Sequence, residues 1–495
     1  MKFNIELKDS QNNREELIRI AIGVMIVRGL EPEFSVDALK ELEEIDGPFD
    51  KFGDAFRDLR DLLWCSIDND DSRDLDQLTV AERLDDGSIK LLVAIADVDS
   101  IVKRNSSIDS HAYINTRSVY TSARIFPMLP LRLSNDLTSL NPGQDRPAMI
   151  CEMHFSQEGE LLRDSIYLAQ VRNKAQLAYD SVSAWLDSKD HMPRTIKAVK
   201  GLDEQLRIQD ELAQKLRIKR HDKGSLEFDI FQPRATFIDD KISEISQQAH
   251  NRARQLIEEF MIATNGCTSR FLADAGIFSM RRVVRSPERW LRIVQVAADL
   301  GYKLPNEADS QALEEFLAKQ HHKDPIRFPD LSLVIVKLMG SGEYIVEKPS
   351  GKAVGHFGLA VTDYMHSTAP NRRYPDLITL RLIKSVLASI KPPYSIDELK
   401  ELALHCTLQE DISKRVERQV RKSEAALLLS SRIGQYFDGI VSGVNDKGVW
   451  VRIFNPPVEG KIVSSPGEFK VGHLMRVKLI STNVERGFID FVVTG

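Results

Sequence analysis

Hydrophobic positions at the start of the chain follow the spacing of helices. In residues 14–45 they recur every three or four positions, and a turn signal at Gly29–Pro32 divides the stretch in two. This pattern predicts a short helical region at residues 1–58. The positions that define it are Leu17, Ile20, Ala21, Val24, Val36, Leu39 and Leu42.

From about Leu62 the pattern changes to short apolar runs bounded by turn residues. Three such runs occupy residues 62–67 (LLWCSI), 77–84 (QLTVAERL) and 91–98 (LLVAIADV). The turn residues Asp85–Gly87 separate the second run from the third. Runs of this length and composition are typical of β-strands, so this part of the chain should form a hairpin-rich sheet.

Longer amphipathic stretches dominate the centre of the chain and predict helices. A strand-like segment at Phe228–Ile238 interrupts them. The mixture predicts an α+β unit at residues 59–433, with a mixed sheet surrounded by helices. The helical stretches are residues 165–220, 250–275, 285–300, 375–390 and 395–435.

After Phe437 the pattern returns to five short alternating runs separated by Gly, Pro and Asn. Five strands in so short a span suit a closed barrel of the OB type, which we predict for residues 434–495. OB-type barrels often bind single-stranded nucleic acid.

Composition narrows the class of protein. An apolar content of 42% with 28% charged residues is that of a globular chain, and the net charge of −6 argues against a wholly basic nucleic-acid coat. The four cysteines are far apart without a CxxC pair, so we expect buried thiols rather than a zinc site. The first residues contain early acids and no apolar signal segment, which favours a cytoplasmic protein without a membrane partner.

An aspartate cluster stands directly between two strand-like runs. Asp68, Asp70, Asp71, Asp74 and Asp76 lie within nine residues, and so many like charges need compensation. A divalent cation supplies it, and Mg²⁺ prefers a few carboxylates together with water and phosphate oxygens. Bound next to RNA or DNA, such ions can activate water and stabilise the leaving oxygen in phosphodiester cleavage.

Two other interpretations of this cluster compete with a metal site. From spacing alone, a solvated acidic loop is as good an explanation as a metal site. A calcium loop of the EF-hand type fits the alternating acids but fails in detail. Its glycine position is occupied by Arg73 and its bidentate glutamate position by Thr79, and the flanking runs look like strands.

A second candidate for chemistry lies far downstream, where Arg372 and Arg373 follow a proline turn and precede a predicted helix. Guanidinium groups suit phosphate recognition because they present a planar fork of donors. Taken alone, such a pair is more often a surface salt-bridge partner, and the neighbouring Tyr364, His366 and Tyr374 strengthen a nucleic-acid function only modestly.

Taken together, the two segments resemble the ribonuclease II and ribonuclease R (RNB) family. The metal-site pattern T-I-D-x5-D-x-D-D corresponds to Ser66, Ile67, Asp68, Asp74, Asp76 and Gln77, and the pattern H-F-T-S-P-I-R-R-Y-P-D-L corresponds to residues 366–377. The resemblance extends over about residues 60–435, and the final strands look like the S1 domain that usually closes these enzymes. Further segments match in the same order at Val93–Val98, Ser118–Tyr120, Ile125–Arg146, Gly224–Ile230 and Ile257–Asn265.

The resemblance implies an RNB catalytic domain that removes nucleoside 5′-monophosphates from the 3′ end of single-stranded RNA with Mg²⁺. The loss of one negative charge at Gln77 adds the expectation that the enzyme needs more Mg²⁺ than usual or prefers Mn²⁺. It implies that Asp68, Asp74 and Gln77 hold the metal. Asp76 would be the carboxylate most directly tied to catalysis, and Arg372 would contact the scissile phosphate. The implied RNA-binding residues are Tyr120, Phe228, Glu258 and Arg373, and the candidates for a basic channel are Lys215, Arg217, Lys219 and Arg220.

Some of these roles have competing explanations in the sequence itself. Without the resemblance, Tyr120 and Phe228 are better explained as core aromatics, and Glu258 equally well as an acid on a helix surface. Gln77 stands where the family pattern has a fourth aspartate, which removes one negative charge from the site. This departure keeps a second function open, that of a catalytically weak or inactive RNA-binding regulator. In either case we expect a monomer.

Overall fold

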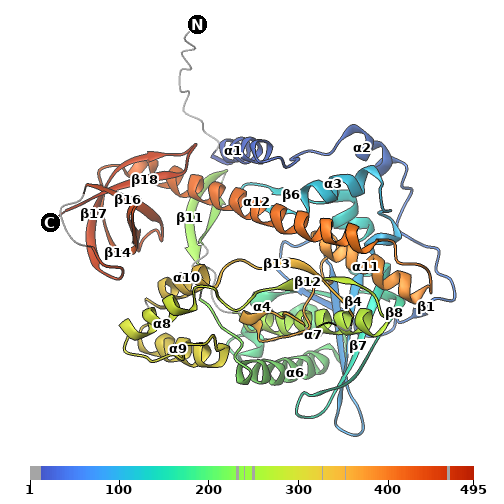
Figure 1. The fold of residues 1–495 in the computed structure, drawn as a ribbon. Helices are drawn as coiled ribbons and strands as arrows, with labels where there is room; N and C mark the ends of the chain where they lie inside the picture. The colour runs from blue at the N-terminus through green and yellow to red at the C-terminus, as the bar shows by residue number, and fades with distance from the viewer. Residues whose placement is uncertain are drawn as a thin grey trace.

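A seven-stranded mixed sheet forms the centre of the large domain in the computed structural model of the chain (Figure 1). The structure describes residues 13–229, 233–238, 240–247, 251–325, 327–349, 351, 353–464 and 469–494. Across the sheet the strands are β1 (Phe56–Asp58), β8 (Leu161–Arg172), β7 (Asp145–Phe155), β4 (Ile89–Ala96), β3 (Gln77–Arg83), β2 (Cys65–Asp68) and β9 (Ala175–Ala178).

Most neighbouring strands in this sheet are antiparallel, as expected for a hairpin-rich region. Only β1 with β8 and β2 with β9 pair in parallel. The strands predicted from the apolar runs at 62–67, 77–84 and 91–98 are confirmed as β2, β3 and β4. The α+β fold class is therefore confirmed.

The predicted helix over residues 165–220 is wrong in its first part. Residues up to Arg172 belong to β8, and Ala175–Ala178 form β9, while helix α6 begins only at Leu202. Burial along β9 alternates with period two, which is the signature of a strand. The apolar residues of β8 fit a helical spacing as well, and pairing with β7 over eleven residue pairs decides the conformation.

Helices α6 (Leu202–Asp222) and α7 (Arg252–Asp274) cover one face of the sheet. The hydroxyl of Thr79 in β3 donates to Gln209 of α6 at 2.8 Å. Cys267 of α7 lies beside Cys151 of β7. All four cysteines are free and buried, so the prediction of buried thiols is confirmed.

A helical subdomain of α8 (Trp290–Asp299), α9 (Ser310–Lys323) and α10 (Phe328–Met339) projects from the large domain below the barrel in Figure 1. It has its own hydrophobic cluster around Trp290 and Phe316. The remaining helices are α1 (Asn13–Val27), α2 (Val36–Glu43), α3 (Ser107–Asn115), α4 (Tyr179–Leu186), α5 (Arg194–Lys197), α11 (Tyr374–Leu387) and α12 (Ile396–Leu429). The small sheets contain β5 (Val119–Tyr120), β6 (Ile125–Phe126), β10 (Pro233–Ile238), β11 (Lys241–Gln247), β12 (Ser279–Val283) and β13 (Glu343–Glu347).

The C-terminal strands close into a barrel of five strands, as predicted. Its core contains Phe437, Val451 and Phe491. In the described part of the chain, no helix is both long enough and apolar enough to cross a membrane. The barrel strands are β14 (Tyr436–Asn445), β15 (Gly448–Ile453), β16 (Glu459–Ser464), β17 (Leu474–Asn483) and β18 (Phe488–Val493).

The long helix α12 runs across the large domain and ends at the barrel (Figure 1). A capping box of Ser395 and Glu398 fixes its start. Near its end, Glu424 is only 1% exposed, and Ser122 from the turn between β5 and β6 donates to its Oε2 at 3.1 Å. Burial raises the pKa of Glu424 to about 7.

Replacing Glu424 with Gln should stabilise the protein at alkaline pH. Because the pKa of the folded state lies above that of the unfolded state, the favourable contribution is full below about pH 4.5 and is lost as the pH rises through 7. Glu424→Gln removes this loss, so unfolding at pH 8.5 should require about 2–3 kcal/mol more than in the parent. At pH 5 the two proteins should differ little.

Urea unfolding at both pH values measures this effect. Glu401→Gln, which changes an exposed acid on the same helix, is the matched control. Its free energy of unfolding should differ from that of the parent by the same amount at both pH values. An equal effect of Glu424→Gln at pH 5 and pH 8.5 would contradict the assignment of a buried, neutral carboxylic acid.

Candidate active site

The predicted aspartates gather where two neighbouring strands of the central sheet meet. Asp68 is the last residue of β2 and Gln77 the first of β3, so the connecting loop brings Asp74 and Asp76 to the same end of the sheet. Burial raises the pKa of Asp74, and the negative charge of Asp68 adds to this effect. Asp70 and Asp71 are exposed on the outside of the loop.

Asp76 connects this loop to the distant arginine pair. Its Oδ1 accepts the backbone N–H of Asn371 at 3.0 Å, and its Oδ2 accepts Nε–H of Arg372 at 2.8 Å, over a separation of 296 residues. Asp76 is 1% exposed, and burial raises the pKa of its carboxyl to about 7, although Arg372 opposes this shift. Both carboxylate oxygens are therefore engaged in holding the Arg372 loop.

The backbone of the arginine pair is held from its other side by residues 116–118. The N–H of Tyr374 donates to Thr116 O at 2.8 Å, and the N–H of Ser118 donates to Arg372 O at 3.1 Å. Arg373 donates to Asp376 at 2.7 Å, and Pro375 lies in the first turn of α11. The arginines thus precede a helix N-terminus, which favours anions.

Tyr120 completes this group from β5. Its backbone N–H donates to Oε1 of Glu417 on α12 at 3.1 Å. Its hydroxyl lies beside Asp74, where it counteracts part of the rise in the pKa of that carboxyl. Burial raises the pKa of Tyr120 itself to about 12, so the phenol stays protonated and can donate.

These groups lie deep in the fold and still reach solvent. Burial opposes the charge of Arg372, yet Tyr120, Asp76 and Asp74 raise its pKa above the usual value, and 39% of its side chain is exposed. Burial likewise raises the pKa of Glu258 on α7, although 55% of that side chain is exposed. Both side chains are therefore surrounded by protein and still accessible to solvent.

The carboxylates fit a hard divalent cation. Among the described residues, no three acidic, histidine or cysteine side chains come close enough to enclose a metal ion by themselves. Mg²⁺ does not need such a cage, because one or two carboxylates with water and substrate phosphate oxygens are its usual ligands. Asp68 and Asp74 can supply these carboxylate ligands. Asp76 is less suited to bind a metal ion, because both of its oxygens already accept hydrogen bonds from Asn371 and Arg372.

Gln77 is oriented differently from Asp76. It pairs with Ile95 of β4 and is 6% exposed. Regular alternation along β3 puts its side chain on the side of Thr79, which faces α6, and on the opposite side from Asp76. As an uncharged residue at the end of the strand, it adds no negative charge to the carboxylate group.

The other predicted residues occupy different surroundings. Phe228 is half-buried against the hydrophobic cluster of α8–α10. Glu258 lies 3.8 Å from Arg220, which also bonds to Glu259. The predicted channel cations Lys215, Arg217 and Lys219 form ion pairs with Glu211, Glu227 and Glu160, so they do not form an uncompensated basic row.

Sequence reasoning missed two residues beside the aspartates, Tyr179 and Arg254. Tyr179 follows β9, whose parallel pairing with β2 places it next to Asp68, and this charge raises its pKa further after burial. Arg254 of α7 stacks over the Tyr179 ring at 4.7 Å and donates to Asn69 at 3.3 Å. Only the pairing of β2 with β9 brings Tyr179 close to Asp68, and the local spacing of residues does not reveal this pairing.

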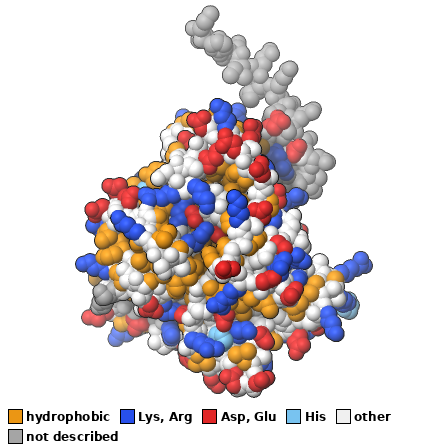
Figure 2. Space-filling view, turned by 90° about the vertical axis from the view of Figure 1, so that its right-hand side faces the viewer, with side chains coloured by type: hydrophobic (Ala, Val, Ile, Leu, Met, Phe, Trp, Pro, Cys, Tyr) orange, Lys and Arg blue, Asp and Glu red, His pale blue; other side chains and the backbone are white. Residues whose placement is uncertain are grey.

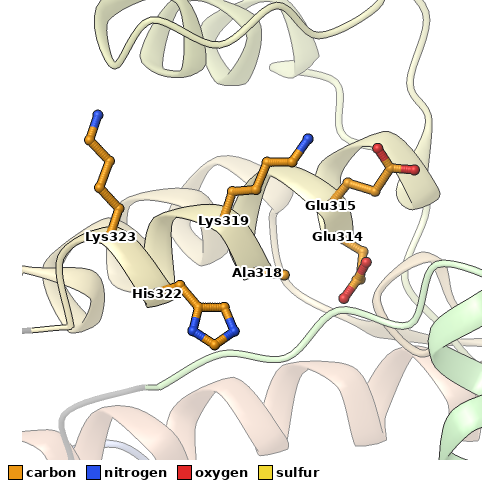
Figure 3. A pocket seen from close by; sticks show the side chains of 6 residues that line it. All are labelled: Glu314, Glu315, Ala318, Lys319, His322 and Lys323. Atoms are coloured by element: carbon orange, nitrogen blue, oxygen red, sulfur yellow. The ribbon is translucent and has the colours of Figure 1, made fainter.

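A surface hollow along α9 does not coincide with this site. The hollow has a volume of about 550 Å³ and is lined by six residues of α9, which Figure 3 labels. No predicted site residue is among them. Figure 2 shows one face of the molecule, on which Lys and Arg are interspersed with Asp and Glu instead of forming one patch.

Comparison with known proteins gives two domain matches. The RNB domain matches residues 56–389, and the RNase II-type exonuclease C-terminal S1 domain matches residues 435–494. A ribonuclease R from Aquifex aeolicus is 31% identical over 95% of this chain and 70% of its own length. Ribonuclease R 1 from Lactococcus lactis is 29% identical over 88% of this chain, which spans 56% of that relative.

The apo structure of Mycoplasma genitalium RNase R has the same fold, with a TM-score of 0.87, 23% identity and coverage of 97% of this chain and 78% of that one. The same M. genitalium protein has also been solved with ribose-methylated single-stranded RNA and with double-stranded RNA. The RNB match covers most of the large domain, and the site geometry lies within it. The chain therefore belongs to the RNB family and ends in an RNase II-type S1 domain.

Proposed function

We propose that this protein is a metal-dependent exoribonuclease that hydrolyses single-stranded RNA from the 3′ end and releases nucleoside 5′-monophosphates. The observation that carries the proposal is the contact between Asp76 and Arg372, which joins the aspartate loop to the arginine pair within an RNB domain. Carboxylates that suit Mg²⁺ then lie next to a guanidinium that suits a phosphate.

Each residue has a distinct part in this proposal. Asp68 and Asp74 would hold Mg²⁺ or Mn²⁺, which when bound supplies an activated water and charge neutralisation. Asp76 fixes Arg372 so that its remaining donors face the scissile phosphate. Arg373, Tyr120, Glu258 and Phe228 are proposed to bind the RNA, and Gln77 is proposed at the edge of the metal site.

An assay with 5′-labelled RNA and DNA oligomers, incubated side by side with Mg²⁺, Mn²⁺ or EDTA, tests this function. Successive shortening of the RNA from its 3′ end, dependent on metal, supports the exonuclease. RNA that is retained in a complex but stays intact with either metal would refute it and support the alternative, an inactive RNA-binding regulator. The cytoplasmic location and the monomeric state stay predictions.

The alternative function, an inactive RNA-binding regulator, is suggested by Gln77. Substitutions at this position distinguish an effect of charge on metal binding from direct coordination of the metal by the amide oxygen. Gln77→Asp places a negative charge at the end of β3, beside the strand that ends in Asp68. At an effective protein dielectric of about 20, this charge should favour a divalent cation by roughly 1–2 kcal/mol. We therefore expect the Mg²⁺ concentration for half-maximal activity to fall about tenfold.

Gln77→Ala is the matched control because it removes the amide without adding charge. If the amide oxygen is a ligand, Gln77→Ala should raise the Mg²⁺ requirement; if only charge matters, it should leave it unchanged. Equal Mg²⁺ titrations of the parent and Gln77→Asp would show that position 77 does not influence the metal site.

A further inference from the structure

Arg254, in the first turn of α7, reaches the aspartate loop that connects β2 to β3. Its Nη2 donates to Oδ1 of Asn69 at 3.3 Å, and its guanidinium lies 4.7 Å over the ring of Tyr179. Arg252, two positions earlier on the same helix, forms an ion pair with Asp210. Among the described residues, no acidic side chain forms such a pair with Arg254. Arg254 is therefore not one of the salt bridges that hold the helices of this domain together.

Both contacts of Arg254 lie directly beside Asp68. Asn69 follows Asp68 in the chain, and its backbone N–H donates to Oδ1 of Asp68 at 2.7 Å. Tyr179 follows Ala178, the residue of β9 that pairs with Asp68 of β2. Burial is the main cause that raises the pKa of Tyr179, and the negative charge of Asp68 is the next. Arg254 thus contacts two neighbours of Asp68, one along the chain and one across the sheet.

The beginning of the aspartate loop has few other anchors. Gln176 of β9 donates to Ser72 O at 2.9 Å and holds the middle of the loop. Of the side chains that the structure describes, Arg254 alone bonds to residues 69–71 from another element. Since Asp68 ends its strand, the direction of its carboxylate depends on how this short segment is held.

The charge of Arg254 opposes a bound cation, whereas its contacts favour one. A positive group near Asp68 repels a divalent ion. Arg254 and Arg372 both counteract the rise in the pKa of Tyr179, so both guanidinium groups lie near this phenol. A ligand whose surroundings are fixed by hydrogen bonds, however, binds a metal ion more tightly. The two effects have opposite signs, and a measurement of metal binding therefore distinguishes them.

We propose that Arg254 is a positioning residue of the metal site. Supported by the ring of Tyr179, it holds Asn69 and thereby fixes the direction in which Asp68 presents its carboxylate to a divalent cation. The bond to Asn69 is the contact through which it acts. This inference rests on the proposed function, because it takes Asp68 as a metal ligand.

Binding of Mn²⁺ to the protein without RNA tests this role, with free Mn²⁺ measured by electron paramagnetic resonance. Asp68→Asn identifies the ion at this site, because that variant should lose it. Arg254→Met keeps an unbranched side chain without charge or donors, and it should raise the Kd for this ion about tenfold. Arg254→Lys keeps the charge without the planar fork of donors, and it should also raise the Kd, by several-fold.

A double variant shows whether the bond to Asn69 carries the effect. Asn69→Ala should raise the Kd about as much as Arg254→Met does. The double variant should bind Mn²⁺ no more weakly than either single variant, because both changes break one contact. Arg252→Met is the matched control, since it removes the ion pair with Asp210 and leaves the aspartate loop unchanged. Its Kd for Mn²⁺ should stay within about twofold of that of the parent.

The outcomes separate this inference from the proposed function. If Arg254→Met binds Mn²⁺ as tightly as the parent or more tightly, or if Arg254→Lys binds it equally, the positioning role is wrong and the proposed function stands. Effects of Arg254→Met and Asn69→Ala that multiply, or an equal loss in Arg252→Met, would overturn the role as well. If Asp68→Asn binds Mn²⁺ like the parent, the metal assignment of the proposed function fails, and this inference fails with it.

Discussion

Asp76→Asn should reduce RNA hydrolysis by about a thousandfold or more while leaving RNA binding in EDTA within about threefold of the parent. Asp76 accepts from Asn371 N–H and Arg372 Nε–H with its two oxygens. An asparagine has only one acceptor oxygen, so its NH₂ group must face one of these donors and push it away. Loss of one positioned electrostatic group costs about 10²–10³ in rate, and misplacement of the arginine adds to this.

Hydrolysis of labelled RNA under single-turnover conditions measures the loss. Asp70→Asn is the matched control, because Asp70 is an exposed acid of the same loop and its loss should change the rate by less than a factor of three. Thermal unfolding of Asp76→Asn is measured alongside, so that a loss of stability is distinguished from a loss of catalysis. A variant that degrades RNA at the parental rate would show that Asp76 is not needed for catalysis.

Much of the fold could be predicted because the hydrophobic period is a local property. Helices α7, α11 and α12 and the five barrel strands follow their apolar spacing closely. The stretch at 165–178 misled the prediction, because its apolar residues fit a helix as well as a strand and only pairing with β7 and β2 decides between them. Helices α9 and α10 were not predicted, although α10 is largely apolar.

In the site, too, features that depend on neighbouring residues could be predicted, whereas contacts between distant segments could not. The charge density of residues 68–76 makes a cation site one candidate in the sequence itself. The contact between Asp76 and Arg372 spans 296 residues, and only the family resemblance assigned these two residues to one site. Glu417 looks like a surface acid on a helix, yet it is largely buried and bonds to both Arg117 and the Tyr120 backbone. Such roles depend on packing that no local pattern records.

Arg372→Lys should lower kcat by about a hundredfold with little change in KM. Lysine keeps a positive charge next to Asp76, so the carboxylate remains compensated and the protein should fold. An ammonium group cannot, however, bond to Asp76 through Nε and present a second planar donor pair to a phosphate. Arg372→Ala is less informative, because an unpaired buried carboxylate costs about 3–5 kcal/mol and confuses activity with stability.

Arg373→Lys is the paired comparison, because the two arginines are adjacent but their contacts differ. Arg373 bonds to Asp376 and Thr368 and has no bond to Asp76 among the described residues. If it holds RNA away from the reacting phosphate, its substitution should raise KM several-fold and change kcat less than Arg372→Lys does. Steady-state kinetics on one labelled RNA decides between the two roles. Equal losses of kcat in both variants would mean that the two arginines act as one unit and that the contact with Asp76 does not give Arg372 a distinct role.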